Sequence, residues 1–274
     1  MEESHEKCVS SVLARVRRLR LRSVRDRTRL HYLEGFRNFI QAIDVKIPVE
    51  TIVYNETLAR NPAVQKNVRL SKRAGVRVVR VTPEEFRRVS VTLRASGIGA
   101  IVRQHWTPLD QADVRAGSCW IALSSLRSPG NVGTIFRTAE AAGAAGVLLL
   151  GDGVDPFDPA AVRASMGSLF GLRLVRTTLR EFGRWASERG CRVLGMIPSA
   201  ESVYTEVPVG PALVVLFGEE RKGLSPEERA ICTHTARIPI VGRADSLNVG
   251  VAAGIMLYEV LRRRGPPAGG VALP

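Results

Sequence analysis

Six short apolar stretches in the second half of the chain constrain its fold most. Their apolar residues run on continuously instead of alternating with polar ones, and helical patterns lie between several of them. Strands of this kind are covered on both faces, which is typical of a mostly parallel sheet flanked by helices. We therefore predict an α/β domain there. Its expected strands are residues 119–124, 146–151, 173–177, 191–197, 212–218 and 236–241.

The first hundred residues predict a second, smaller α/β unit. Residues 28–43 place apolar side chains at helical spacing, so we expect an amphipathic helix there. The side chains in question are Tyr32, Phe36, Phe39, Ile40 and Ile43. Strands are expected at 50–54, 76–81 and 97–104, and helices at 61–75 and 82–89.

These patterns divide the chain into five expected parts. The division is a basic N-terminal extension (1–27), the small α/β domain (28–106), a polar linker with a proline (107–117), the larger α/β domain (118–265) and a tail (266–274). With 45% hydrophobic and 24% charged residues, the composition is that of a globular protein with a buried core.

The composition also narrows the class of protein. No apolar run approaches the roughly 18 residues of a membrane span, and the acidic first residues do not resemble a signal peptide, so we expect a cytoplasmic protein. The four cysteines are far apart without a C-x-x-C pair, which favours reduced thiols over a disulfide scaffold or a zinc site. The histidines are equally scattered, and we assign no metal ligand.

The charge of the chain points to a polyanionic partner. The formal net charge is +14, and eight arginines lie between Arg15 and Arg29 against one acid, Asp26. Such a cluster is also compatible with a solvated helix face or a frayed basic tail, but with the whole chain basic we favour nucleic acid. The candidate RNA-binding residues are Arg17, Arg18, Arg20, Arg22, Arg29, Arg37 and Arg163.

The stretch "SPGNVGTIFRTAEAAGAAGVLLLG" (128–151) predicts a glycine turn, a helix and a buried strand. Gly130, Asn131 and Gly133 lie at the N-terminal end of that helix, where free amides favour an anion. Arg137 follows Gly133 by one turn, on the same side as the glycines. A solvent-exposed arginine on a helix would give the same pattern, so this motif alone does not establish a binding site.

Two later segments carry further polar groups. "ALVVLFGEERKGLS" (212–225) predicts a buried strand that ends at Gly218, directly before Glu219 and Glu220. Loops after the carboxyl ends of parallel strands bind ligands in α/β folds. In "ARIPIVGRADSLNVGVAAGIMLYEVLRR" (236–263), we expect Ser246 to cap a helix, with Asn248 beside it. The apolar positions expected for that helix are Leu247, Val251, Ile255 and Tyr258.

Together these segments resemble the SPOUT superfamily, and within it the SpoU-type RNA ribose 2′-O-methyltransferases. The resemblance covers about residues 118–264 and depends on three motifs in the same order and spacing. The motifs are N-V-G-x-x-x-R at 131–137, L-F-G-E-E-x-x-G at 216–223 and I-P…S-L-N-V at 238–249. The first hundred residues, with "RTRLHYLEGFRNF" (27–39), resemble the ribosomal-protein-like RNA-binding domain that often precedes this catalytic domain.

The resemblance implies a mostly parallel α/β catalytic domain with a deep trefoil knot, acting as a homodimer. It also implies that S-adenosylmethionine is bound in the knot, with the adenine held by the backbone. The positions carried over for the cofactor are Leu216, Phe217, Gly218, Ile238, Pro239 and Leu247.

The implied catalytic residues are Arg137, which activates the ribose 2′-hydroxyl, and Asn131, which positions it. Glu220, Ser246 and Asn248 complete the set. Because a guanidinium stays protonated in nearly any setting, we expect Arg137 to grip the adjacent phosphate and stabilise the developing alkoxide instead of acting as a base. Arg163 lies where this family often has polar residues facing the RNA, so it is a candidate contact to the RNA; a surface arginine without a role is the alternative.

Several functions stay open at this point. The front domain favours ribosomal RNA of the large subunit, and transfer RNA is the alternative substrate. Some relatives protect producers of ribosome-directed antibiotics, so a resistance role belongs to the same hypothesis. A non-catalytic RNA-binding protein on this fold, and a Rossmann-type small-molecule methyltransferase with an unknotted chain, are the remaining alternatives.

Overall fold

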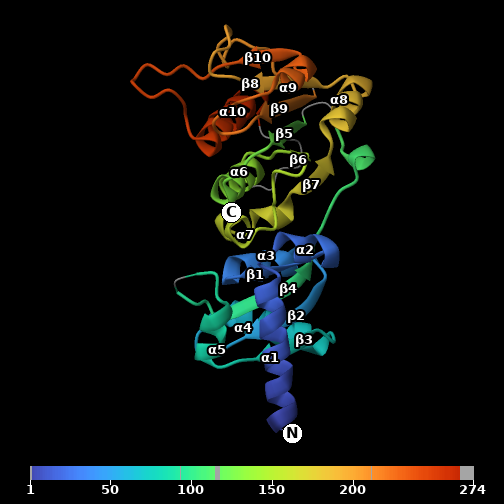
Figure 1. The fold of residues 1–274 in the computed structure, drawn as a ribbon, viewed down its shortest axis with the longest axis vertical. Coiled ribbons are helices and arrows are strands. Elements are labelled where there is room, and N and C mark those ends of the chain that lie inside the picture. The colour runs from blue at the N-terminus through green and yellow to red at the C-terminus, as the bar shows by residue number, and fades with distance from the viewer. Residues whose placement is uncertain (1, 93, 115–117, 211, 266–274) are drawn as a thin grey trace. The chain divides into compact units, whose positions relative to one another are not determined.

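The computed structural model describes residues 2–92, 94–114, 118–210 and 212–265, which form two compact units (Figure 1). One unit consists of Met1–His105 together with Asp155–Gly171, and the other of Trp106–Val154 together with Leu172–Pro274. Within the described residues, no helix is both long enough and apolar enough to cross a membrane. The expected tail (266–274) and positions 115–117 of the expected linker lie outside the described residues.

The first unit is built on a four-stranded sheet with helices around it. The strand order is β1-β4-β2-β3; β2 and β3 are parallel, and the other pairs are antiparallel. Its strands are β1 (Leu30–Glu34), β2 (Val49–Tyr54), β3 (Arg77–Arg80) and β4 (Ile98–Arg103). Its helices are α1 (Glu2–Arg18), α2 (Arg22–Thr28), α3 (Phe36–Asp44), α4 (Pro62–Arg73), α5 (Pro83–Val89), α7 (Pro159–Ser165) and the short 3-10 helix η2 (Ser168–Gly171).

The helix predicted for residues 28–43 is wrong in its first part. Leu30–Glu34 form β1, fully buried and paired antiparallel with β4, and only Phe36–Asp44 are helical. Gly35 separates the two elements with φ at +100°, a conformation that glycine adopts without strain. The ladder with β4 satisfies the backbone groups of β1, so the distant pairing overrides the local spacing.

The arginine-rich N-terminus is part of the first unit, not an extension. Helix α1 buries one apolar face, made of Val9, Val12, Leu13 and Val16, in the core of this unit. Two arginines of the basic run bind protein groups: Arg15 on α1 donates to Glu50 at 3.0 Å, and Arg20, just after α1, donates to the Val89 carbonyl at 3.2 Å. The apolar stripe inside the basic run makes this segment a folded helix.

The segment Asp155–Gly171, expected in the larger domain, also packs in the first unit. The Arg25 side chain, 2% exposed, is ion-paired with Asp155 and lies 4.0 Å from Asp158. The ring of Phe157 lies tilted against that of His31, with ring centroids 4.6 Å apart. The glycines before it and the proline at its start indicate a loop, but no sequence pattern indicates that the segment packs with residues far upstream.

The second unit contains the predicted parallel sheet. All its pairings are parallel, in the order β10-β8-β9-β5-β6-β7. The strands are β5 (Cys119–Ser124), β6 (Gly146–Leu150), β7 (Arg173–Thr177), β8 (Arg192–Met196), β9 (Leu213–Phe217) and β10 (His234–Ala236). The helices are the 3-10 helix η1 (Leu109–Gln111), α6 (Pro129–Ala141), α8 (Leu179–Glu188), α9 (Pro226–Ile231) and α10 (Val249–Arg264).

The last strand is shorter and earlier than the prediction of 236–241. Only His234–Ala236 pair with β8, and the chain then continues irregularly up to Asn248. Arg237 already forms a bridge with Val203 instead of β8, and Pro239 beyond it has no amide hydrogen for a ladder.

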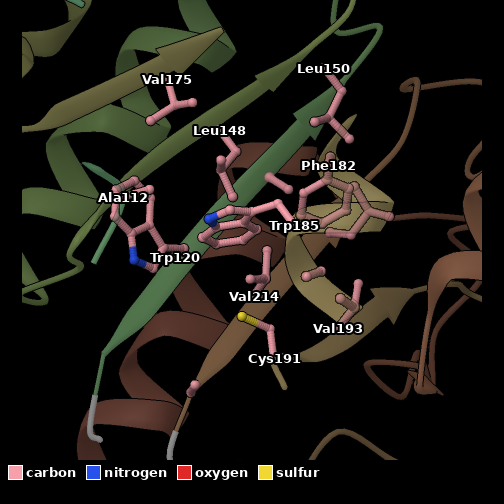
Figure 2. Close-up of a cluster of buried hydrophobic side chains, with 14 of the residues drawn as sticks. Ala112, Trp120, Leu148, Leu150, Val175, Phe182, Trp185, Cys191, Val193 and Val214 are labelled. Carbon is pink, nitrogen blue, oxygen red and sulfur yellow. The ribbon is translucent and has the colours of Figure 1, made fainter. Parts of the chain in front are cut away.

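Trp120 of β5 is fully buried in the hydrophobic core of the second unit. Figure 2 shows this core, which also contains Leu148, Val214 and Phe182. The expected linker contributes to this core, because Ala112 is buried in it and the indole nitrogen of Trp120 donates to the Asp113 carbonyl at 2.8 Å. The described part of the linker is therefore packed structure.

The apolar face predicted for the last helix is the exposed one. Helix α10 packs against α6 with a different stripe, made of Val249, Ala253, Met256, Leu257 and Val260. The side chains of Leu247, Val251 and Tyr258 are 38%, 52% and 53% exposed. Small residues on the buried side let α10 approach α6 closely, and this decides which face turns inward.

All four cysteines are free thiols, as the sequence predicts. Burial raises the pKa of Cys119 to about 12 and the pKa of Cys191 to about 11. Since the thiolate is the reactive form, both residues behave as apolar core residues.

Candidate active site

The loop after β9 is built as a tight turn that presents Glu220. A Cβ on Gly218 would lie 2.2 Å from the Gly223 carbonyl oxygen, so only glycine fits there. The amide of Gly223 donates to the Glu219 carbonyl at 2.9 Å and closes the turn. This places Glu220 beyond the carboxyl end of a parallel strand, as predicted.

The carboxylate of Glu220 is held by main-chain amides at the start of α6. It accepts hydrogen bonds from the Ser128 amide at 3.2 Å, the Arg127 amide at 3.3 Å and the Asn131 side-chain amide at 3.4 Å. Partial burial opposes ionisation, but hydrogen bonds from its own backbone, from these two amides and from Asn131 outweigh it and lower the pKa of Glu220. The side chain is therefore an ionised acceptor, not a proton donor.

Asn131 links Glu220 to the start of the last helix. Its side-chain oxygen accepts a hydrogen bond from the Asn248 side-chain amide at 2.9 Å. The Asn248 oxygen in turn caps α10, accepting from the amides of Gly250 at 2.8 Å and Val251 at 3.3 Å. An ionised carboxylate can only accept, so it fixes the orientation of Asn131, and Asn131 fixes that of Asn248.

Two helix N-termini meet at this line of side chains. Ser128 caps α6 and Asn248 caps α10. A Cβ on Gly250 would lie 3.3 Å from the Thr134 side chain of α6, so the absence of a side chain there permits the close approach. The positive ends of both helix dipoles favour an electron-rich oxygen at the same place.

The other two predicted catalytic residues, Arg137 and Ser246, are not part of the hydrogen-bonded line of Glu220, Asn131 and Asn248. Arg137 is exposed on α6 and, among the described residues, has no hydrogen-bond or ion-pair partner. Ser246 is exposed two residues before the cap, so the prediction that it caps the helix is wrong. Asn248 caps instead because its side-chain oxygen reaches two free amides of the first turn.

Sequence reasoning missed Ser124 and Glu228 as supports of the site. The Ser124 hydroxyl, at the end of β5, donates to the buried Glu228 carboxylate. Glu228 also accepts from the Ser225 amide at 2.7 Å, in a capping box at the start of α9. The S-x-x-E spacing signals this cap, but no local pattern pairs position 124 with position 228.

The predicted cofactor segments leave backbone groups free for a ligand. In the described chain, no main-chain hydrogen bond to another main-chain group involves residues 238–247, which include Ile238, Pro239 and Leu247. The side chains of Leu216 and Phe217 are buried in β9, so these residues can offer a ligand only their backbone. Amides and carbonyls without a main-chain partner at 238–247 fit an adenine that is recognised by the main chain.

The predicted RNA-binding arginines all belong to the first unit, including Arg163 on α7. Two of them bind groups of the protein itself. Arg20 donates to the Val89 carbonyl, and Arg22 is ion-paired with Asp26 at 3.4 Å. The remaining ones are exposed, namely Arg17, Arg18, Arg29, Arg37 and Arg163.

Comparisons with known proteins agree with this architecture. Residues 118–258 match the SpoU rRNA Methylase family, and residues 12–100 match the MRM3-like substrate binding domain. The chain is 34% identical over 190 residues to an uncharacterized tRNA/rRNA methyltransferase of Synechocystis, covering 67% of each chain. It is 34% identical to a 23S rRNA uridine 2′-O-methyltransferase of Streptomyces viridochromogenes over 60% of each chain.

Solved structures with a similar fold extend over both units. An AdoMet-bound rRNA methyltransferase from Sinorhizobium meliloti is 34% identical with a TM-score of 0.85, covering 92% of this chain and 94% of that one. A SpoU methyltransferase from Streptomyces viridochromogenes in complex with AdoMet is 29% identical with a TM-score of 0.80, covering 92% and 98%. The chain spans about 60–67% of the curated relatives named above. On its motifs, its fold and these matches, this protein belongs to the SpoU rRNA methylase family.

Proposed function

We propose that this protein transfers a methyl group from S-adenosylmethionine to a ribose 2′-hydroxyl of large-subunit ribosomal RNA. The observation that supports this most is the hydrogen-bonded line Glu220–Asn131–Asn248, which brings one residue from each of the three motifs together. These residues come from segments up to 117 positions apart.

The main chain at Gly218, Ile238 and Leu247 would hold S-adenosylmethionine, which supplies the methyl group on an activated sulfonium carbon. The protein must then orient one hydroxyl and handle one proton. Asn131 and Asn248 each use one side-chain N–H within the line, and the second N–H of each is available to an incoming oxygen.

Arg137 binds the phosphate next to the target ribose and stabilises the oxygen as it loses its proton. A guanidinium offers two parallel donors to a phosphate and stays charged at any physiological pH. Its position on α6, exposed and without a protein partner among the described residues, leaves the side chain available to RNA. Ser246, exposed before α10, is a further contact to the substrate in this proposal.

The first unit captures the RNA in this proposal. Its exposed arginines supply counter-charges to phosphates, and its match to a substrate-binding domain supports the same role. Ribosomal RNA is favoured by the relative from Streptomyces viridochromogenes, named as a 23S rRNA 2′-O-methyltransferase. Such a substrate implies a cytoplasmic protein.

A homodimer through α10 accounts for the exposed apolar face of this helix. The side chains of Val251 and Tyr258 are more than half exposed, and Leu247 extends the same face. Exposed apolar side chains that gather on one helix mark an interaction surface, and a two-fold axis would bury this face against its own copy. We also infer that residues 237–248 thread the trefoil knot that is typical of the superfamily.

The proposed activity is tested by mapping ribose methylation in total RNA from cells with and without the gene. One 2′-O-methyl group in large-subunit ribosomal RNA should be lost on deletion and restored by the wild-type gene but not by the Asn131→Ala variant. Loss of a transfer RNA methyl group instead would assign the other substrate, and no loss in any RNA would refute the activity. Growth of the same strains on ribosome-directed antibiotics tests the resistance role.

A further inference from the structure

A cavity of 310 Å³ opens in the first unit between α4 and the parallel strands β2 and β3. Tyr54, Val68 and Val78 line its interior. Tyr54 is 4% exposed, and Val68 is 6% exposed. The volume lies at the lower end of the range of ligand pockets, roughly 300–1,000 Å³, and the interior is apolar and aromatic.

Cations dominate the rim of this cavity. Arg69, Lys72 and Arg80 line it, against a single acid, Glu56, which lies 4.0 Å from Arg80. Helix α4 as a whole carries four basic side chains and no acidic one. The rim therefore attracts an anion even though Glu56 partly neutralises Arg80.

Tyr54 and Arg80 lie side by side at the ends of their strands. They are paired in the parallel register of β2 and β3, so their side chains leave the same face of the sheet. Burial raises the pKa of Tyr54, with a further contribution from Glu56, so the phenol stays protonated and can donate a hydrogen bond. An aromatic group and a guanidinium thus border the same space.

The combination of interior and rim selects the kind of ligand. A bare phosphate would leave the apolar interior unused, and an uncharged apolar ligand would leave the cations unused. An added protein strand is also disfavoured, because the edge strand β3 carries Arg77 and Arg80, and charged edges oppose strand addition. A nucleotide matches both features, with a planar base and a phosphate.

We propose that this cavity binds one unstacked nucleotide of the RNA substrate, remote in sequence from the methyl-transfer motifs. The base rests on the interior beside Tyr54, and Arg69 and Arg80 bind its phosphate. That the ligand is RNA rests on the proposed function, in which RNA is the substrate of the protein.

The test compares two doubly substituted full-length proteins that lose the same charge. Arg69→Gln/Arg80→Gln removes two rim cations, and Arg73→Gln/Arg88→Gln removes two exposed arginines that do not line the cavity. Binding of a fluorescein-labelled single-stranded decauridylate is measured by anisotropy across a salt series. The rim variant should bind at least about five-fold more weakly and lower the salt slope by about 0.7, the value for the loss of one phosphate contact on a single strand. The control should change Kd less than about two-fold.

A second readout locates the bound nucleotide. Decauridylate with 4-thiouridine, crosslinked to the wild-type protein, should label peptides that contain Tyr54 or the segment 65–72. Equal weakening by both variants, or crosslinks only outside these peptides, would overturn the proposal. All substituted side chains are exposed, and far-ultraviolet circular dichroism checks that the variants fold.

The failure of this site and the failure of the proposed activity give different results. Labelled methyl transfer to bulk ribosomal RNA is measured with wild-type protein and with the rim variant. A wild-type protein that crosslinks through Tyr54 but transfers no methyl group refutes the activity and leaves the nucleotide site. Transfer with the same KM in wild type and rim variant refutes the site and leaves the activity.

Discussion

Asn248 donates a hydrogen bond to the side-chain oxygen of Asn131 over 2.9 Å, although 117 positions separate them in the chain. One residue caps α10 and the other lies in the first turn of α6, so the bond joins two helix N-termini. Glu220 completes the line from the loop after β9. Three segments that no local sequence pattern links to one another thus meet in one hydrogen-bonded unit.

The first prediction concerns the carboxylate that orients this line. Glu220→Gln replaces an ionised acceptor by a neutral amide, which weakens the bonds from the Ser128 and Arg127 amides and frees Asn131 to rotate. We expect kcat to fall about 10- to 100-fold, because small displacements of positioning groups cost rate in this range. Single-turnover methyl transfer measures it. The control is Glu219→Gln in the same loop; an equal loss in both variants would contradict the prediction.

The pH dependence follows from the sign of the shift at Glu220. Its pKa is lowered in the folded protein, so its contribution is fully present above the ordinary value near 4.5 and is lost only as the pH falls towards the lower, folded value. The acid limb of the rate profile above about pH 5 therefore does not come from Glu220. If Glu220→Gln moved that limb, the carboxylate would be a titrating catalyst and our assignment would be wrong.

Arg137→Lys tests the geometry of the proposed phosphate contact. Lysine keeps the charge but loses the two parallel donors, so we expect kcat to fall about 100-fold while thermal stability stays unchanged. Arg180→Lys, at an exposed position on α8, is the matched control and should behave as wild type. Near-normal turnover of the lysine variant would show that paired donors are not required.

Much of the second unit could be predicted from sequence because its signals are local. Continuous apolar strands, Ser128 before Pro129 and the glycine at position 218 each constrain their own neighbourhood. Which face of α10 is buried could not be predicted from such local signals. Both sides of the helix are apolar or small, and only the close approach of Gly250 to α6 shows which side is buried.

The exposed face of α10 gives a prediction about assembly. Light scattering after size exclusion should give a dimer for the wild type and a monomer for Val251→Arg, because a buried unpaired charge opposes association. Leu70→Arg, on α4, introduces the same side chain at an apolar position that is 48% exposed and should stay dimeric. A monomeric wild type, or a dimeric Val251→Arg, would rule out this interface.

The buried His31 predicts a specific loss of stability in acid. Burial, with smaller contributions from His105 and Arg25, lowers the pKa of His31 well below its usual value. The neutral ring therefore stabilises the fold above about pH 6.5, and this contribution is lost as the pH falls below that value. His31→Phe keeps a ring beside Phe157 and removes the titration.

Urea unfolding at several pH values measures this effect. Below about pH 6.5 the wild type should lose about 1.4 kcal/mol more per pH unit than His31→Phe, and the two curves should be parallel above pH 7. His234→Phe is the control and should keep the wild-type slope. Parallel curves for wild type and His31→Phe throughout would contradict the prediction.

The first unit was harder to predict because long-range contacts determine it. Tyr32 lies on a helical spacing with Phe36, yet pairing with β4 makes residues 30–34 a strand. Arg25 looks like one of many surface arginines, but it is buried and ion-paired with Asp155, 130 positions later. A local sequence pattern does not indicate a contact with a residue that far along the chain.

Methyl transfer from tritium-labelled S-adenosylmethionine to deproteinised ribosomal RNA tests the central claim most directly. With wild-type protein the label should appear in a single 2′-O-methylnucleoside after complete nuclease digestion. Asn131→Ala should bind the cofactor by calorimetry but transfer the label at least about 100-fold more slowly. Label in a base instead of a ribose, or equal transfer by wild type and Asn131→Ala, would contradict the account.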